Sequence, residues 1–240
     1  MQTTQTAIVT GASSGIGLGL TTALVARGYR VVANSRRISE AGTVAPSEAL
    51  ALVDGDIGDP ETARRLVETA VRRFGGVDVL VNNAGIFISK PFTEYTAEDF
   101  ARLVSTNLAG FLYVTQQTVR QMSRQSRGHV VTITTTLADQ PIAGVPASVP
   151  VLTKGGLNAV TAALAIEYAG AGIRFNAIGA GIIDTPMHKP ETHGFLKTLH
   201  PIQRIGQVSE IVDAVLYLTE ATFVTGEVLH VDGGAHAGKW

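Results

Sequence analysis

The fold is decided by a glycine-rich stretch near the start of the chain, Thr10-Gly11-Ala12-Ser13-Ser14-Gly15-Ile16-Gly17. It follows the apolar run 7–9, which predicts a buried strand, and it precedes residues 18–27, whose apolar positions have helical spacing. A strand, a glycine turn and a helix in this order favour a phosphate-binding loop, because glycine allows positive φ and lets a ligand approach bare N–H groups. The helix N-terminus adds unpaired donors and partial positive charge. A glycine-rich turn without a ligand is the alternative interpretation.

Length and composition predict one domain over residues 1–240. Of the 240 residues, 45% are hydrophobic and 16% are charged, which is enough for a large α/β core. The net charge of −1 does not indicate a nucleic-acid partner or an anionic membrane surface. Cysteine is absent, which excludes disulfides and cysteine nucleophiles, and no histidine spacing matches a trusted metal-ligand pattern, so no metal is expected. Residues 1–5 lack a signal-peptide pattern and no apolar stretch reaches membrane-span length, so we expect a cytoplasmic protein without membrane contact.

Apolar strand-like runs alternate with helix-like stretches along the whole chain. Strands are expected at residues 7–9, 29–34, 49–53, 77–81, 130–134, 173–178 and 228–231. Helices are expected at residues 18–27, 60–74, 97–125, 151–169 and 209–219. Asp59, Thr96 and Ser209 are the expected N-caps of the second, third and fifth of these helices. This alternation predicts an α/β fold with a Rossmann-like, doubly wound parallel sheet of about seven strands and helices on both faces. The crossover after the second strand is short, with one helical turn or none.

Residues that follow the strands are candidate ligand contacts, because doubly wound sheets bind ligands beyond the carboxyl ends of their strands. After the second strand come Ser35, Arg36 and Arg37, with no acidic residue before Glu40. An acidic residue here would suit the free 2′-hydroxyl of NAD, whereas arginine suits the 2′-phosphate of NADP. The pattern therefore indicates NADP(H), with NAD(H) still possible. A solvated arginine pair is the alternative interpretation.

Three further turns are compatible with a dinucleotide at the same edge. After the third strand, Asp56 is placed to accept from an adenine amino group, with the Ile57 N–H beside it. After the fourth strand, the run Asn82-Asn83-Ala84-Gly85 has small residues that let backbone pass close to a ribose. After the fifth strand comes the hydroxyl cluster Thr134-Thr135-Thr136, which is equally compatible with ordinary turn capping.

Together these motifs resemble the short-chain dehydrogenase/reductase family over essentially the whole chain. The glycine motif T-G-x-x-x-G-x-G stands at residues 10–17, N-N-A-G at residues 82–85, and Asp232-Gly233-Gly234 follows the last strand. Asn107, in the run S-T-N-L, matches the asparagine of the family's fourth helix. The resemblance implies hydride transfer between the nicotinamide C4 and the carbon of a small-molecule carbonyl or alcohol.

The resemblance also implies roles for individual residues. In the family, a tyrosine four residues before a lysine donates the proton, and the lysine lowers the phenol's pKa and binds the nicotinamide ribose. The lysine is Lys154 here, Asn107 would position a water in the proton relay, and Thr135, with Thr136 as second choice, would stand where a serine holds the carbonyl oxygen. The catalytic prediction is therefore Lys154, Thr135 and Asn107. The resemblance and the turns together predict a cofactor site formed by Gly11, Ser13, Ser14, Gly15, Ile16, Gly17, Ser35, Arg36, Arg37, Asp56, Ile57, Asn83, Ala84, Gly85, Lys154, Ile183 and Thr185.

The sequence departs from the family pattern at the proton donor. Pro150 stands four residues before Lys154, and proline has no acidic proton. The nearest hydroxyls are those of Ser148 and Thr153. The interval between Thr135 and position 150 is about two residues longer than the family pattern, and Ala180-Gly181 replaces the family's usual Pro-Gly.

A substrate lid is expected at residues 182–207. It carries His188, His193 and His200, which are either an alternative proton source or ordinary surface histidines. The sequence thus favours an NADP(H)-dependent oxidoreductase with an atypical or impaired proton donor. A dinucleotide-binding protein without redox turnover (a sensor, scavenger or partner subunit) is the main alternative, and a non-redox lyase-like or dehalogenase-like enzyme is a third. The resemblance also implies a homodimer or homotetramer formed through the helices at 97–125 and 151–169.

Overall fold

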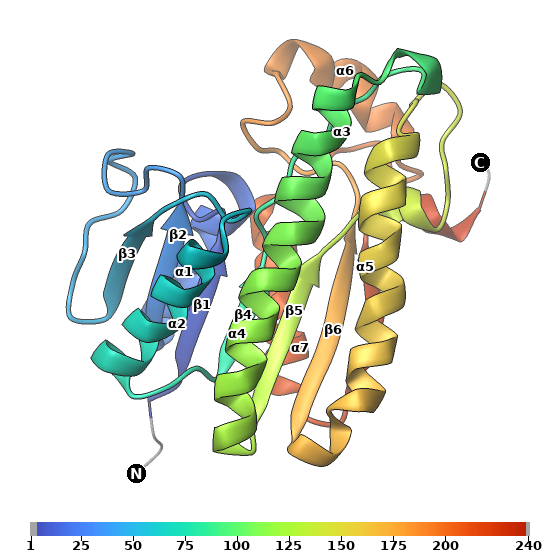
Figure 1. Cartoon of the computed structure of the whole chain (residues 1–240). Helices are drawn as coiled ribbons and strands as arrows, with labels where there is room; N and C mark the ends of the chain where they lie inside the picture. The colour runs from blue at the N-terminus through green and yellow to red at the C-terminus, as the bar shows by residue number, and fades with distance from the viewer. Residues whose placement is uncertain (1–3, 239–240) are drawn as a thin grey trace.

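The computed structural model, which describes residues 4–238, contains a parallel sheet at the centre of the molecule (Figure 1). In the described residues the sheet has seven strands in the order β3-β2-β1-β4-β5-β6-β7. The strands are β1 (Thr6–Thr10), β2 (Arg30–Ser35), β3 (Leu50–Asp54), β4 (Val79–Asn82), β5 (Gly128–Ile133), β6 (Ile173–Ala180) and β7 (Val228–Val231). The predicted fold class is confirmed. The sequence predicts no signal peptide at residues 1–5, and residues 1–3 of that stretch lie outside the described residues.

Helices cover both faces of this sheet. α1 (Gly15–Ala26) and α7 (Val208–Glu220) lie on one face, and α2 (Pro60–Phe74), α4 (Gly110–Gln125) and α5 (Ser148–Glu167) lie on the other (Figure 1). Alternate residues of β1 therefore enter different cores: Ala7 and Val9 pack with α1 and α7, whereas Ile8 packs with α2 and α4. Because neither face of the strands contacts water, their sequences are continuously apolar rather than alternating.

The β2–α2 region matches its sequence prediction closely. The connection between β2 and β3 contains no helix, as the short crossover predicted. α2 begins at Pro60, and the Asp59 carboxylate accepts from the Glu61 N–H at 3.0 Å. The helix ends at Gly75, whose φ of +89° lies in the left-handed region that glycine tolerates. Capping and a terminal glycine therefore fix both ends of α2.

The helical stretch expected at residues 97–125 has the predicted limits, but it is not one regular α-helix. α3 (Ala97–Leu103) is followed by a π-helical segment, Val104–Ala109, before α4 begins at Gly110. The predicted cap is present, because the Thr96 hydroxyl accepts from the Asp99 N–H and the Asp99 carboxylate accepts from the Thr96 N–H, both at 3.1 Å. A Cβ on Gly110 would lie 2.6 Å from the Ile57 side chain, so this glycine lets the helix approach the end of β3. The π segment changes the helical phase next to this close contact and carries Asn107.

The expected cap of α7 is also wrong. Its N-cap is Gln207 rather than Ser209, and the Glu210 carboxylate accepts from the Gln207 N–H at 2.7 Å. An ion pair between Arg204 and Glu210 at 2.6 Å holds that carboxylate in place. The N-cap therefore lies two residues earlier than the serine signal indicates.

α5 begins at Ser148, three residues before the predicted start, and Pro150 occupies its third position. The missing N–H of proline costs little there, because first-turn N–H groups have no partner within the helix. The expectation that no apolar stretch approaches membrane-span length is wrong: α5 has 20 residues and is long and apolar enough by length and composition alone. In the structure it packs on the sheet through Leu157, Thr161 and Ala165, which are buried.

The predicted lid contains more regular structure than its sequence suggests. It includes α6 (His193–Leu196) and two 3-10 turns, Pro190–Thr192 and Lys197–Leu199. An isolated bridge pairs Ile183 with Gly206 and so joins the two ends of this segment. Figure 1 shows α6 above the carboxyl end of the sheet, on the same side as the top of α3 and α5.

Candidate functional site

The glycine loop lies between β1 and α1, and side chains at Gly11 and Gly17 would clash with its surroundings. Gly11 has a φ of +66°, and a Cβ on Gly17 would lie 2.2 Å from the Gly11 oxygen and 2.5 Å from the Asn83 amide nitrogen. The N-cap of α1 is Ser14, which is exposed and makes no side-chain cap hydrogen bond. The first-turn N–H groups of α1 therefore remain available to an anion that approaches the bare backbone of this loop.

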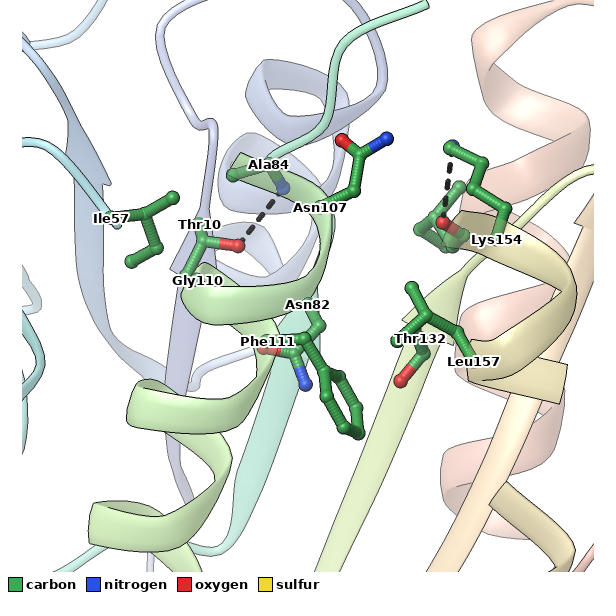
Figure 2. Close-up of a pocket in the computed structure, with 11 residues that line it drawn as sticks. Thr10, Ile57, Asn82, Ala84, Asn107, Gly110, Phe111, Thr132, Lys154 and Leu157 are labelled. Atoms are coloured by element: carbon green, nitrogen blue, oxygen red, sulfur yellow. Dashed lines mark hydrogen bonds between the residues drawn. The ribbon is translucent and has the colours of Figure 1, made fainter. Parts of the chain in front are cut away.

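A network of hydrogen bonds centred on Thr10 holds the glycine loop against the turn after β4. The Thr10 hydroxyl donates to the Val81 oxygen at 3.4 Å and accepts from the N–H groups of Asn83 and Ala84, each at 3.0 Å. The Asn83 amide donates to the oxygens of Thr10 and Gly11 at 2.9 and 3.2 Å. Figure 2 shows the bond from Ala84 to the Thr10 hydroxyl. The two predicted motifs thus form one rigid unit, although Thr10 itself was not among the predicted site residues.

The turns after β2 and β3 present their charged side chains to solvent. Arg36 and Arg37 are exposed, and Arg37 lies 3.8 Å from Glu40 in an exposed ion pair. Asp56 is exposed and accepts from the Gly58 N–H at 2.8 Å through one carboxylate oxygen. Ile57 is buried against α4. Two cations and one carboxylate therefore stand at the same sheet edge as the glycine loop, where a 2′-phosphate and an adenine could be held.

Lys154, Asn107 and Gly85 come together although they lie far apart in the sequence. A Cβ on Gly85 would lie 3.4 Å from the Asn107 amide oxygen and 3.7 Å from the Lys154 Nζ. The Lys154 ammonium donates to the Ile133 oxygen at 3.4 Å (Figure 2). Burial lowers the pKa of Lys154 to about 8, because the charged form is desolvated. Three predicted residues thus border one small volume between the β4 turn and α5.

The Asn107 side chain is committed to the protein. Its amide oxygen accepts from the Ile86 N–H at 2.9 Å, and its amide nitrogen donates to the Ile86 oxygen and the Thr153 hydroxyl, both at 3.1 Å. The Thr153 hydroxyl in turn donates to the Pro150 oxygen at 3.0 Å and is fully buried. Asn107 therefore ties the β4 turn to the start of α5, and Thr153 has no hydroxyl proton left for a ligand.

The three threonines after β5 differ in what their hydroxyls do. Thr134 donates to the Ile178 oxygen at 3.1 Å, and Thr136 donates to the Asp232 carboxylate at 2.5 Å, so both face inward. Thr135 is half-buried and accepts from the Leu137 N–H at 3.3 Å. The Thr135 hydroxyl proton remains available to donate, which makes it better placed than Thr136 to hold a carbonyl oxygen.

The lid begins beside the glycine loop, where a Cβ on Gly15 would lie 3.1 Å from the Thr185 side chain. Ile183 is buried beneath this segment. The interpretation of the lid histidines as surface side chains is wrong for His200, which is buried and accepts from the Ile182 N–H at 3.0 Å. Burial lowers the pKa of both His188 and His200, so their neutral forms are favoured. His193 lies 3.2 Å from the His188 oxygen.

The cavity between β4, β5, α4 and α5 is lined mostly by uncharged side chains (Figure 2). Sequence reasoning missed several of them, because they lie inside strands and helices whose apolar pattern gives no local sign of a ligand. Its lining residues are Thr10, Ile57, Asn82, Ala84, Asn107, Gly110, Phe111, Thr132, Ile133, Lys154 and Leu157. Over residues 4–238, no group of three or more His, Asp or Glu side chains is arranged to hold a metal ion. The fold and the glycine loop are together typical of one class of α/β protein, in which a dinucleotide is held at the carboxyl ends of parallel strands.

Comparison with known proteins places the chain within that class. A family model described as enoyl-(acyl carrier protein) reductase matches residues 11–236. The chain is 37% identical over 241 residues to a Streptomyces violaceoruber protein described as ketoacyl reductase 2 of the granaticin polyketide synthase, covering 96% of this chain and 95% of that one. The chain belongs to the short-chain dehydrogenase/reductase family.

Solved structures agree with this assignment. The NADP-bound structure of ElxO superposes with a TM-score of 0.89 at 27% identity, covering 98% of this chain and all of that one (100%). A 3-ketoacyl-(acyl-carrier-protein) reductase from Brucella melitensis, complexed with NADH, superposes with a TM-score of 0.87 at 30% identity, covering 97% of this chain and 98% of that one. Similar structures therefore contain either nicotinamide dinucleotide.

Proposed function

We propose that the chain is an NADP(H)-dependent oxidoreductase that reduces a small-molecule carbonyl or oxidises the corresponding alcohol, with an atypical proton donor. The observation that carries the proposal is the bare glycine loop, in which a Cβ on Gly17 would collide with the Gly11 oxygen at 2.2 Å. A dinucleotide pyrophosphate fits such a loop, because the uncapped first turn of α1 offers N–H donors and partial positive charge. Family membership supports redox chemistry on this fold.

The preference for NADP(H) rests on Arg36 and Arg37. Both are exposed at the end of β2, and Arg37 is drawn toward Glu40, which leaves Arg36 as the stronger candidate for a 2′-phosphate. The ElxO structure holds NADP, but the Brucella melitensis reductase holds NADH, so the relatives alone favour neither cofactor. The arginine argument therefore carries the cofactor prediction.

The cofactor, when bound, supplies the hydride, and the chain's own residues would position the substrate and move the proton. The Thr135 hydroxyl would donate to the carbonyl oxygen, and Lys154 would bind the nicotinamide ribose. Pro150 stands four residues before Lys154, where the resemblance implies a tyrosine. The ketoacyl reductases among the relatives favour a ketone as substrate.

A second function, dinucleotide binding without turnover, is favoured by one observation. The residues nearest Lys154 in the first turn of α5 offer no acidic proton, because Pro150 has none and the Thr153 hydroxyl is bonded to the Pro150 oxygen. A protein of this kind would bind NADPH and leave it unoxidised.

Parallel fluorescence titrations with NADPH and NADH, followed by an NADPH-oxidation screen, separate the two functions. The screen uses ethyl acetoacetate, 4-nitrobenzaldehyde and phenanthrenequinone. We expect NADPH to bind about tenfold more tightly than NADH, a difference of about 1.4 kcal/mol, and at least one carbonyl to be reduced. Tight binding without oxidation of NADPH by any probe would support the non-catalytic function. Tighter binding of NADH would contradict the assignment of Arg36.

A further inference from the structure

Among the described residues that line the cavity, Lys154 alone has a side chain with an ionisable proton. The other polar side chains nearest to it are occupied: Asn82 donates to the Thr115 hydroxyl at 2.9 Å, and Asn107 uses both amide hydrogens on protein atoms. Reduction of a carbonyl requires a proton at the oxygen as the hydride arrives at the carbon. The described side chains around this cavity offer one acid for that step.

The Lys154 ammonium has protons to spare. Its hydrogen bond to the Ile133 oxygen is long, at 3.4 Å, and at most one of its three N–H groups is used there. No carboxylate of the described residues lies within ion-pair distance of it. The groups that face it, Gly85, Asn107 and the cavity lining, are not titratable, so desolvation alone sets its acidity. An ammonium with a pKa of about 8 gives up a proton more readily than an ordinary lysine.

We propose that the Lys154 ammonium is itself the general acid, donating a proton directly to the substrate's carbonyl oxygen. This inference rests on the proposed function. When bound, the cofactor would supply the hydride for the new C–H bond, and the π electron pair of the carbonyl would move to its oxygen. One Lys154 N–H bond breaks as the new O–H bond forms, and the neutral amine then takes a proton from water. The lysine thus combines proton transfer with its role at the cofactor.

The kinetic test compares the wild type with Lys154→Arg and Pro150→Tyr in the NADPH-dependent reduction of ethyl acetoacetate. Wild-type kcat is expected to be constant below about pH 8 and to fall tenfold per pH unit above it, because only the protonated amine is an acid. Lys154→Arg keeps the positive charge but does not titrate, so kcat should fall by about 10²–10⁴ with a small change in the Kd for NADPH. A variant that keeps wild-type kcat, or a wild-type profile without a break near pH 8, would overturn the proposal.

A direct titration of the amine gives a readout that does not depend on turnover. Trace acetylation of the intact protein, with and without NADP⁺, is measured by mass spectrometry across the same pH range, with the exposed Lys197 as internal reference. Labelling of Lys154, normalised to that reference, should rise through about pH 8. A rise only in the range of an ordinary lysine, about pH 10, would contradict the proposal.

The outcomes also separate this inference from the function on which it rests. If NADPH does not bind, the proposed function fails, whatever the amine titration shows. If NADPH binds and only Pro150→Tyr reduces the carbonyl, then the wild-type lysine is not a proton donor and this inference alone fails. If neither protein reduces any probe, both fail.

Discussion

At the scale of single residues, we expect Gly17 to control the access of a dinucleotide to the loop. In Gly17→Ala the new Cβ would meet the Gly11 oxygen at 2.2 Å and the Asn83 amide at 2.5 Å, both of which belong to the bonded unit around Thr10. We expect the Kd for NADPH to rise by more than about tenfold, about 1.4 kcal/mol, measured by fluorescence titration. Gly170→Ala is the matched control, because nothing lies within 4 Å of its added Cβ. Equal NADPH affinity in the two variants would show that the loop does not bind the cofactor.

A substitution at Arg36 tests whether the chain prefers NADPH to NADH, rather than whether it binds a dinucleotide at all. Arg36→Asp replaces an exposed cation at the end of β2 with a carboxylate, which repels a 2′-phosphate and accepts from a free 2′-hydroxyl. The Kd for NADPH should rise by about tenfold or more while that for NADH stays level or falls. Arg72→Asp, an exposed substitution on α2, controls for net charge. Parallel weakening of both cofactors by Arg36→Asp would refute the assignment.

Much of the candidate site was visible in the sequence, but its bonding was not. The glycine and N-N-A-G motifs were found because each is a local run with a backbone reason for its residues. The role of Thr10 was missed because its partner Asn83 lies 73 residues away. The full commitment of Asn107 was missed for the same reason, since Thr153 lies 46 residues away. Contacts between distant turns leave no periodic signal, and only the fold shows which hydroxyls stay free.

At the scale of elements, periodicity found the sheet and most helix limits but not the π segment. Val104–Ala109 keeps helical backbone angles on both sides, with Gly110 at φ −58° and ψ −48°, so its side-chain pattern resembles that of a continuous helix. What distinguishes it is packing, because Asn107 bonds to Ile86 and to Thr153 of α5. Tertiary bonds therefore determine this local geometry.

Thr153→Val tests that contact between α5 and the π segment. The variant keeps the shape of the side chain but leaves one N–H of the Asn107 amide without an acceptor and removes the hydroxyl that donates to the Pro150 oxygen. Loss of these buried bonds should lower the free energy of unfolding by about 1–3 kcal/mol, measured by urea denaturation. Thr153→Ser retains the hydroxyl and should lose less. If the two variants are equally unstable, methyl packing rather than the hydrogen bond matters at this position.

The pairing of β5 with β6 contains an acid-sensitive group, His129. This side chain is buried, and its Nε2 lies 3.0 Å from the Asn176 amide nitrogen. Burial lowers the pKa of His129 to about 3, and the positive charge of Arg174 contributes to the same shift. The unfolded chain binds this proton near pH 6.5 and the folded chain does not, so stability is lost as pH falls below 6.5. Between pH 7 and 5 the stability of the wild type relative to His129→Gln should fall by about 2 kcal/mol, measured by urea denaturation. A constant difference over this range would show that the two states titrate alike.

At the scale of the whole molecule, the helices that cover the sheet leave an apolar stripe exposed on α5. Leu152 and Ile166 are 63% and 83% exposed, and their spacing of fourteen residues places them on nearly the same side of the helix. The exposed Ala159 and Ala163 lie between them and would allow close approach. The length and apolar composition of α5 would also suit a membrane, so the occupant of this stripe has to be tested. We expect a second copy of the chain, as the family resemblance implies.

The substitution Ile166→Glu tests whether a second copy of the chain or a membrane covers the stripe, with the molecular mass in solution as the readout. In a two-fold symmetric contact each patch faces its own copy, so one substitution places two carboxylates in the same apolar interface. Light scattering after size exclusion should therefore show the wild type as a dimer or tetramer and the variant as a smaller species, with its circular dichroism unchanged. Val71→Glu, at a partly exposed apolar position on α2, should leave the mass as it is. A different result would identify a membrane as the partner: a monomeric wild type that co-floats with lipid vesicles, and an Ile166→Glu variant that does not. In that case the stripe would be covered by lipid and not by a second copy of the chain.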